Sequence, residues 1–389
     1  MSNNRQPEIR FPGFMEDWEE RKLDELVEQI IREVPKPNKP YYRMSVRSHA
    51  KGTFRQFVDN PDKVAMDKLF IVKKDDLVVN ITFAWEHAIA VVKEENDGLL
   101  VSHRFPTYRA DGKSDIKFLN YVVSKEDFRR KLEFISPGGA GRNRVLNKKD
   151  FLKLKIFVPK IEEQQKIGMF FKQLDDTIAL HQRKLDLLKE TKKGFLQKMF
   201  PKNGAKVPEI RFPGFTEDWE ERRLQEVVDR YDNLRIPITA SKRVAGNTPY
   251  YGANGIQGYV EGYTHDGEFI LVAEDGANDL KNYPVQYVDG KVWVNNHAHV
   301  IQAKENLVDN MFLMNAIRSI NIEPFLVGGG RAKLNADVLM KLEVIIPLKS
   351  EQQKIGAFFK QLDDTIALHQ RKLDLLKETK KGFLQKMFV

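Results

Sequence analysis

The chain has 389 residues, of which 41% are hydrophobic and 31% charged, so it can bury the cores of two or three domains and is not one small domain. It contains no cysteine, which excludes disulfides, zinc thiolate sites and cysteine nucleophiles. Its 64 basic residues outnumber its 55 acidic ones, and the formal net charge of +9 favours a polyanionic partner.

The N-terminal residues 1–6 are polar and lack the apolar core of a signal peptide. No apolar run elsewhere in the sequence is long enough to cross a bilayer. We therefore expect a cytoplasmic protein without a membrane partner.

Two segments of the chain occur twice with almost no change. Residues 7–23 read PEIRFPGFMEDWEERKL and return at 208–224 with two substitutions. Residues 163–200 begin with EQQKIG and return at 351–388 with one substitution. The sequence therefore predicts a tandem of two equivalent units with an internal pseudo-twofold repeat.

The stretches between the repeats, residues 24–158 and 225–346, show no such identity to each other. Both contain short β-branched runs bounded by polar residues, which are typical of strands, and each has one stretch that predicts a short helix. The expected strands lie in 68–80, 88–92, 151–158, 268–273, 291–295 and 344–347, and the expected helices in 115–122 and 309–319. We therefore predict an α+β fold with two mixed α/β domains.

The repeated segment 163–200 carries an apolar stripe at alternating steps of three and four residues and contains no proline, which predicts one long helix in each copy. A narrow stripe on a charged helix needs a partner, so we expect two long antiparallel coiled-coil helices that separate the two domains. Each helix would span about 55 Å and act as a spacer. The alternative is a helical hairpin inside an ordinary core. The stripe consists of Phe171, Leu174, Ile178, His181, Leu185, Leu188, Lys192, Phe195 and Met199, and in the second copy of Phe359, Leu362, Ile366, His369, Leu373, Leu376, Lys380, Phe383 and Met387.

These elements set the predicted domain boundaries and the register of the helices. The four predicted segments are an N-terminal domain, a central long helix with its linker, a second domain and a C-terminal long helix, at 1–158, 159–206, 207–347 and 348–389. Complete antiparallel overlap would place His181 beside His369. We expect this pair to be a hydrogen-bonded layer that sets the register.

The sequence lacks motifs for nucleotide hydrolysis and amino-methylation. The glycine-rich runs 138–141 and 328–330 are not followed by the lysine and the serine or threonine of a phosphate-binding loop. There is no Asn-Pro-Pro-Tyr or Asp-Pro-Pro-Tyr segment, which an amino-methylating enzyme would use to hold its target base. His297 and His299 could share one side of a strand, but no carboxylate cluster has metal-site spacing. We expect a chain that binds and positions, with no catalytic residue, metal or cofactor of its own.

Basic residues mixed with aromatic and amide residues occur in both variable stretches, and phosphate anchoring with base-edge reading requires this combination. Arginine can form two hydrogen bonds with guanine, and asparagine can do so with adenine. The alternative for any single one of them is an ordinary solvated surface position. The candidate DNA-binding residues are Tyr42, Arg43, Arg47, His49, Lys51, Arg55, Arg104, Arg142, Asn143, Arg144, Arg243, Tyr250, Tyr251, Asn254, Asn295, Asn296, His297, Arg331 and Lys333.

Both halves of the chain follow one motif order. Each opens with Phe-Pro-Gly-Phe, passes through a variable domain to a glycine-rich bend and Leu-Asn, and continues through an apolar strand ending in proline into Glu-Gln-Gln-Lys-Ile and the long helix. This pattern covers nearly the whole chain and resembles the specificity (S) subunit of type I restriction-modification enzymes. Its most specific parts are residues 159–168 and 347–356, together with YYGANGIQG at 250–258.

The resemblance implies that the two variable stretches are target recognition domains, each reading one half of a bipartite, gapped site in double-stranded DNA. It implies that the long helices dock two methyltransferase subunits, and it leaves open whether restriction (motor) subunits join them. S-adenosylmethionine would then bind to the methyltransferase subunits, and ATP and Mg2+ to the motor subunit. The chain itself would be a non-catalytic specificity subunit.

Two other functions fit parts of the sequence. A coiled-coil scaffold that holds two ligand-binding domains apart explains the repeat, but it does not explain the arginine- and amide-rich variable stretches. A self-sufficient nuclease or methyltransferase conflicts with the missing motifs. Cofactor-dependent activity of the purified chain alone would identify the second of these alternatives.

Overall fold

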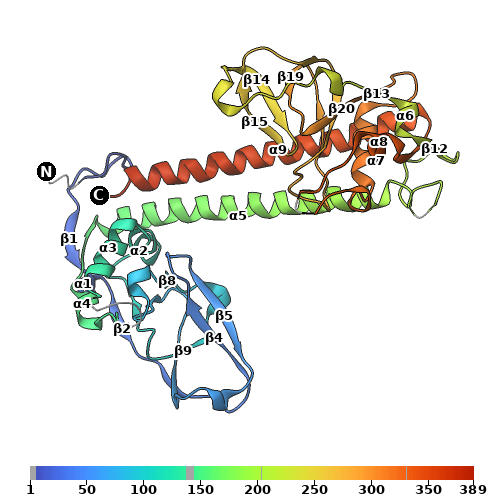
Figure 1. Cartoon of the computed structure of the whole chain (residues 1–389). Helices are drawn as coiled ribbons and strands as arrows, with labels where there is room; N and C mark the ends of the chain where they lie inside the picture. Colours follow the sequence, from blue (N-terminus) through green and yellow to red (C-terminus); the bar gives the residue numbers. More distant parts are fainter. Residues whose placement is uncertain (1–5, 137–143, 203, 330) are drawn as a thin grey trace. The chain divides into compact units, whose positions relative to one another are not determined.

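The structure is a computed structural model that describes residues 6–136, 144–202, 204–329 and 331–389. The chain divides into two compact units, and each is described here by itself (Figure 1). The first unit consists of Met1–Leu180 and Leu373–Val389, and the second of His181–Lys372.

Two long helices, α5 (Ile161–Lys198) and α9 (Lys349–Lys386), contribute to both units. Figure 1 draws α5 in green and α9 in red. Helix α5 begins in the first unit and ends in the second, whereas α9 begins in the second unit and ends in the first. The compact units therefore do not coincide with consecutive segments of the sequence.

The first unit contains the first variable stretch. Its strands are β1 (Glu19–Lys22), β2 (Glu28–Ile30), β3 (Glu33–Pro35), β4 (Tyr41–Val46), β5 (Thr53–Val58), β6 (Lys68–Ile71), β7 (Leu77–Val79), β8 (Ile89–Val91), β9 (Leu100–Val101), β10 (Thr107–Arg109) and β11 (Lys155–Val158). Its shorter helices are α1 (Leu23–Leu26), α2 (Ile116–Val123), α3 (Glu126–Phe134) and α4 (Lys148–Leu152). The strands form the sheets β1-β11, β2-β10-β7-β8 and β3-β6-β9-β4-β5, in which β4 and β9 are parallel and the other neighbours antiparallel.

The second unit contains the second variable stretch. Its strands are β12 (Glu220–Arg223), β13 (Val228–Arg230), β14 (Ala245–Gly252), β15 (Gly255–Val260), β16 (His265–Asp266), β17 (Phe269–Ala273), β18 (Val285–Val288), β19 (Lys291–Val294), β20 (Ala298–Ala303) and β21 (Glu343–Ile346). Its shorter helices are α6 (Leu224–Val227), α7 (Asn310–Ser319) and α8 (Ala336–Lys341). The sheets are β12-β21, β13-β20-β17-β18 and β15-β14-β19-β16, in which β14 and β19 are parallel.

The two variable stretches share a backbone frame despite their unrelated sequences. The order β2-β10-β7-β8 in the first unit corresponds to β13-β20-β17-β18 in the second, and α2 and α7 follow the equivalent strands β10 and β20. The stretches differ in the sheet that each adds, which contains β3, β4, β5, β6 and β9 in the first unit and β14, β15, β16 and β19 in the second. The prediction of mixed α/β domains with two long helices is confirmed.

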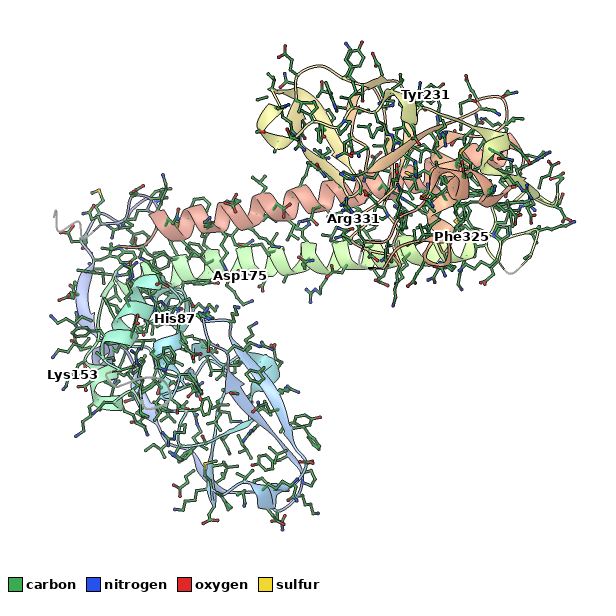
Figure 2. All side chains as sticks on the ribbon, in the orientation of Figure 1. His87, Lys153, Asp175, Tyr231, Phe325 and Arg331 are labelled. Carbon is green, nitrogen blue, oxygen red and sulfur yellow. The ribbon has the colours of Figure 1, made fainter. Side chains whose placement is uncertain are left out.

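Within the first unit, the segments of α5 and α9 run antiparallel. The ring of Phe170 meets that of Phe383 edge to face at 5.2 Å. Asp175 comes after Phe170 in α5 and pairs with Lys380, which comes before Phe383 in α9, so the two segments run in opposite directions. Asp175 also accepts a hydrogen bond of 2.7 Å from the Tyr121 hydroxyl (Figure 2). The contacts of Asp175 thus connect both long helices to the first domain.

Within the second unit, the two helix segments are also antiparallel. Phe195 on α5 meets Phe358 on α9 at 5.0 Å between ring centroids. Earlier in α5, Nδ1 of His181 lies 3.2 Å from Nδ1 of His369, which comes later in α9. The register therefore brings the two histidines side by side, and one imidazole N–H can donate to the other ring.

The apolar stripe assigns Phe171 and Phe359 to the helix interface, and the structure corrects this assignment. Phe171 is buried 5.0 Å from Tyr121 in the first domain core, and Phe359 is buried 6.0 Å from Phe200 in the second. Adjacent helical residues point about 100° apart. Each of these two phenylalanines follows another phenylalanine, Phe170 or Phe358, whose ring faces the other long helix. The second phenylalanine of each pair therefore faces the domain. The other apolar stripe positions are buried or half-buried, namely Leu174, Ile178, Leu185, Leu188, Phe195, Met199, Leu362, Ile366, Leu373, Leu376, Phe383 and Met387.

The two repeated segments of each half are joined by a buried ion pair. Glu163 accepts two hydrogen bonds from Arg10, from Nε and Nη2, both at 2.7 Å. Glu351 accepts the equivalent two from Arg211, both at 2.8 Å. Bidentate arginine–carboxylate pairs fix geometry as well as adding energy. The opening repeat of each half therefore clamps the first turns of its long helix.

The glutamine and glycine of EQQKIG hold the N-terminus of a domain helix that comes earlier in the same half of the chain. The side chain of Gln164 accepts a hydrogen bond of 3.0 Å from the Asp115 backbone, and Asp115 caps α2 by accepting from the Phe118 backbone at 2.8 Å. A Cβ at Gly168 would lie 2.5 Å from the Asp115 carboxylate, so this close approach requires glycine. The second unit repeats the arrangement with Gln352, Asp309, Phe312 and Gly356.

Each domain core is completed by a phenylalanine from the end of a long repeat. In the first unit Phe388 lies 5.5 Å from Phe118 and 6.2 Å from Trp18, as ring centroids. In the second unit Phe200 lies 6.2 Å from Trp219. The first domain therefore depends on residues near the opposite end of the chain.

Candidate nucleic-acid interface

In the first unit, the end of β7 meets the approach to β10 and the segment after the glycine-rich bend. The Ile81 N–H donates to the Arg104 carbonyl at 3.0 Å, and the Leu146 N–H donates to the Ile81 carbonyl at 2.9 Å. The side chain of Arg104 is exposed, and the guanidinium of Arg144 lies 5.4 Å from the ring centroid of Trp85. The other candidates of this bend lie outside the described residues: Arg142 and Asn143.

The second unit repeats this backbone pattern with different side chains. The Glu274 N–H donates to the His297 carbonyl at 2.8 Å, and the Leu334 N–H donates to the Glu274 carbonyl at 2.7 Å. His297 thus occupies the position that Arg104 has in the first unit. Arg331 lies in the bend that precedes Leu334, where its side chain is exposed (Figure 2).

The β4–β5 hairpin of the first unit presents most of the basic candidates. Two of its arginines donate hydrogen bonds to amide side chains nearby. The first, Arg43, donates to Gln56 at 3.0 Å. Arg55 donates to Asn96 at 3.2 Å. Phe57, which sequence reasoning missed, is 58% exposed on the same hairpin, and an exposed ring among arginines suits stacking on bases or sugars. The exposed candidates here are Tyr42, Arg43, Arg47, His49, Lys51 and Arg55.

Two candidates of the second unit are buried, and we remove them from the contact set. Tyr250 is 1% exposed, and its hydroxyl accepts from the Ile238 backbone N–H at 3.2 Å. The guanidinium of Arg243 lies 4.0 Å from the Tyr250 ring centroid and covers it. Asn295 is 3% exposed, and its side-chain oxygen accepts from the His297 backbone N–H at 2.8 Å. The Tyr250 hydroxyl and the Asn295 side-chain oxygen therefore both form hydrogen bonds inside the domain.

The remaining amide and tyrosine candidates of the second unit differ in accessibility. Asn296 is exposed after β19. Asn254 is also exposed, but its side chain donates to the Gly276 carbonyl at 2.9 Å and accepts from the Asn278 N–H at 2.9 Å. Tyr251 is half-buried, and burial raises the pKa of its hydroxyl. Asn254 therefore braces a loop, whereas among the described residues the exposed amide of Asn296 is free to face a ligand.

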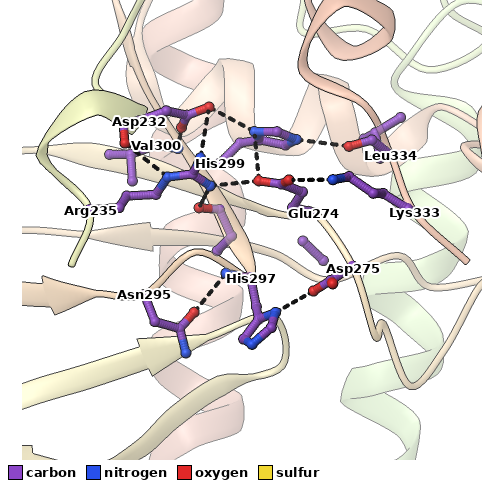
Figure 3. A network of polar contacts seen from close by, with 12 residues as sticks. Asp232, Arg235, Glu274, Asp275, Asn295, His297, His299, Val300, Lys333 and Leu334 are labelled. Carbon is purple, nitrogen blue, oxygen red and sulfur yellow. Dashed lines mark hydrogen bonds and ion pairs between the residues drawn. The ribbon is translucent and has the colours of Figure 1, made fainter. Parts of the chain in front are cut away.

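A layer of buried charge lies beneath the bend of the second unit (Figure 3). Nδ1 of His299 lies 2.8 Å from the Asp232 carboxylate, and its Nε2 lies 2.9 Å from the Leu334 carbonyl. Both ring nitrogens therefore face oxygen atoms, so the imidazole is held from two sides. Burial pushes the pKa of Asp232 upward, but hydrogen bonds from His299 and the Val300 backbone outweigh it and hold the pKa below its usual value.

Glu274 is the second carboxylate of this layer. It accepts from Nη1 of Arg235 at 2.7 Å, and its other oxygen lies 3.0 Å from the Lys333 ammonium. Burial favours a raised pKa for Glu274, yet these two cations hold the pKa below its usual value. The layer is therefore charged and internally paired, and Lys333 is committed to it.

Sequence reasoning named His297, Arg331 and Lys333 but missed the carboxylates and the buried layer. The missed residues are Asp232, Arg235, Glu274, Asp275 and His299. They come from three separate segments and have no fixed spacing, so only the strand order brings them together. The two histidines considered for a metal lie in different clusters: His297 contacts Arg331, and His299 belongs to the buried layer. No group of three or more metal-binding side chains occurs in the described ranges.

Comparisons with known proteins agree with this twofold architecture. The chain matches the family described as type I restriction modification DNA specificity domain at residues 15–190 and 216–378. It is 47% identical over 154 residues to a Haemophilus influenzae protein given the name type I restriction enzyme specificity subunit S.HindORF215P, a match that covers 40% of this chain and 39% of that protein.

Two further likenesses extend over nearly the full length. The chain is 22% identical over 403 residues to a Methanocaldococcus jannaschii protein given the name type I restriction enzyme MjaX specificity subunit, covering 95% of this chain and 92% of that one. The crystal structure of the type I restriction-modification system S subunit from M. genitalium has the same fold, with a TM-score of 0.69, 15% identity and 99% coverage of both chains. Within the described part of the chain, no helix has the length and apolar character to span a membrane.

Proposed function

Because the chain belongs to the family of specificity subunits of type I restriction-modification systems, we propose that each of its two variable stretches reads one half of a bipartite, gapped site in double-stranded DNA. In this proposal α5 and α9 dock two methyltransferase subunits. The chain is a non-catalytic reader, and S-adenosylmethionine, ATP and Mg2+ belong to partner subunits.

The main support for the reading proposal is that the two units share one backbone frame but place unlike side chains at equivalent positions. The hydrogen bonds that place Arg104 beside Ile81 in the first unit place His297 beside Glu274 in the second. Bases are distinguished by their donor and acceptor patterns, so two unlike half-sites require unlike side chains in equivalent positions. The exposed arginines and lysines near both frames would supply the phosphate contacts.

Exposed leucines on both long helices support docking of two copies of one partner. Leu180 on α5 and Leu368 on α9 are each 58% exposed, and Leu187 and Leu375 are each 67% exposed. Residues seven apart lie on nearly the same face of a helix. Exposed large apolar side chains at repeated positions are typical of a protein interface. The pair Leu180 and Leu187 on α5 and the equivalent pair on α9 would each bind one copy of the same partner.

We expect Leu187→Glu and Leu375→Glu each to reduce the complex from two methyltransferase subunits to one, and the double variant to leave none, because a buried unpaired carboxylate opposes docking. Native mass spectrometry of the purified complex measures this stoichiometry. Met169→Glu is the matched control, because Met169 is 60% exposed but has Ala357 at its repeat position. Two bound subunits in all variants would contradict this docking face.

The reading proposal predicts that DNA methylation depends on this chain. Base-resolution mapping of methylated genomic DNA, in cells with and without the chain and with the methyltransferase subunit unchanged, should give a bipartite, gapped motif that disappears without the chain. An unchanged pattern of methylation in the presence of active methyltransferase would contradict the proposal. The scaffold function would then be preferred.

A further inference from the structure

We propose that Asp275, His297 and Arg331 form a guanine-reading site in the second unit, in which Arg331 contacts the base and Asp275 positions its guanidinium. This inference rests on the function proposed above and assigns a base contact to one half-site. The three residues come from the end of β17, the approach to β20 and the bend before α8. Figure 3 shows Asp275 and His297 turned toward each other beside the buried charge layer.

Asp275 binds both of its neighbours through one carboxylate oxygen. Oδ1 accepts from Nη2 of Arg331 at 3.2 Å and contacts Nδ1 of His297. Nη2 also lies 3.2 Å from Nδ1 of His297. All contacts recorded for this guanidinium among the described residues use Nη2. Because Oδ1 of Asp275 and Nδ1 of His297 are in contact with each other, both face the same N–H of Nη2. The second N–H of Nη2 and an adjacent N–H of the guanidinium therefore remain as a two-donor fork for a ligand.

The loop that carries Asp275 is braced from two sides. On one side, the Gly276 N–H donates to the Ala332 carbonyl at 3.4 Å, which ties the loop to the bend that carries Arg331. On the other side, the Asn254 side chain donates to the Gly276 carbonyl at 2.9 Å. Bracing of this kind lowers the entropy lost when a ligand orders the site.

Charge and exposure separate the contacting group from the positioning group. The Arg331 side chain is 60% exposed, whereas that of Asp275 is 23% exposed. Glu274, the neighbouring carboxylate, is already paired with Arg235 and Lys333. Asp275 is therefore the carboxylate that holds Arg331, and the guanidinium reaches outward from it.

The chemistry of the available donors matches a guanine edge. Guanine presents N7 and O6 as neighbouring acceptors in the major groove, and arginine with two free donors is its commonest partner. The first unit has Arg104 where the second has His297, and Thr82 where the second has Asp275, as the equivalent backbone bonds show. The first unit thus lacks this carboxylate at the same point of the frame, and we expect its half-site to be read differently.

The test measures binding of the purified complex to duplexes in which each base pair of the second half-site is replaced in turn, once the methylation motif is known. For the unaltered complex, replacing one G·C pair should weaken binding about tenfold or more. Arg331→Lys keeps the charge but loses the two-donor fork, and should remove discrimination at that base pair alone. Asp275→Asn should reduce discrimination at the same base pair. Arg222→Lys on β12, outside the cluster, is the matched control and should change nothing.

Other outcomes overturn the site. If Arg331→Ala weakens binding equally to every duplex and lowers the dependence on salt, Arg331 contacts a phosphate and not guanine. Unchanged discrimination in Arg331→Lys and Asp275→Asn would also overturn it. Discrimination at the first half-site reports that each variant is folded and bound. If the unaltered complex shows no preference at either half-site, the proposed function itself fails, which separates the two failures.

Discussion

Phe388→Ala should lower the free energy of unfolding of the first unit by about 3–5 kcal/mol, the cost of deleting a well-packed aromatic ring. Phe388 is 6% exposed and lies 5.5 Å from Phe118 and 5.6 Å from Phe171, as ring centroids. Its removal leaves a cavity in the core of a domain formed mainly by the opposite end of the chain. Denaturant unfolding followed by hydrogen exchange of each unit measures the loss and locates it.

Two alanine variants serve as controls for Phe388→Ala. Phe134 is 87% exposed on α3, so Phe134→Ala should change the free energy of unfolding by no more than about 0.5 kcal/mol. Phe200 has the equivalent place in the second unit, so Phe200→Ala should weaken exchange protection there. If Phe388→Ala behaves like Phe134→Ala, the end of the second repeat does not complete the first domain core.

Glu163→Ala should destabilise the first unit by about 3–5 kcal/mol, because it leaves a buried guanidinium without its carboxylate. The side chains of Glu163 and Arg10 are only 1% and 13% exposed, and both hydrogen bonds of the pair are 2.7 Å long. Nη1 of Arg10 is already buried without a hydrogen-bond partner among the described atoms. Chemical denaturation of the variant and the unaltered chain gives the difference directly.

A surface ion pair on the same helix is the control for Glu163→Ala. Lys172 and Asp176 form an i,i+4 pair with side chains 54% and 64% exposed, so Asp176→Ala should cost about 0.5 kcal/mol or less. Replacing Arg10 and Glu163 together with methionine should recover most of the loss, since no unpaired charge then remains. A small effect of Glu163→Ala would mean that the ion pair does not clamp α5 to the domain.

The periodic elements of the fold could be predicted from the sequence. The expected helices 115–122 and 309–319 correspond to α2 and α7, and the expected strand 268–273 corresponds to β17. The histidine pair follows from repeat symmetry and the central place of His181 in its helix, because antiparallel overlap brings equivalent central residues together. Apolar periodicity and the exact repetition of a segment are local signals that survive without any tertiary information.

The shared frame and the site could not be predicted in the same way. The frame is held by backbone hydrogen bonds, such as those of Ile81 and Glu274, which do not require similar side chains. Tyr250 and Asn295 look like surface residues in a turn-rich segment, but tertiary packing buries both. The partnership of Asp275 with Arg331 depends on a long-range approach of two loops. Local patterns carry no information about that approach.

The most direct test of divided recognition is methylation mapping after residues 24–158 are exchanged for the variable stretch of another specificity subunit, with both repeats kept. The expected result is a new sequence in one half of the bipartite motif, with the other half unchanged. The repeats that clamp the helices and carry the exposed leucines are untouched, so methylation should continue. A change in both halves of the motif would contradict the division of recognition between the two variable stretches.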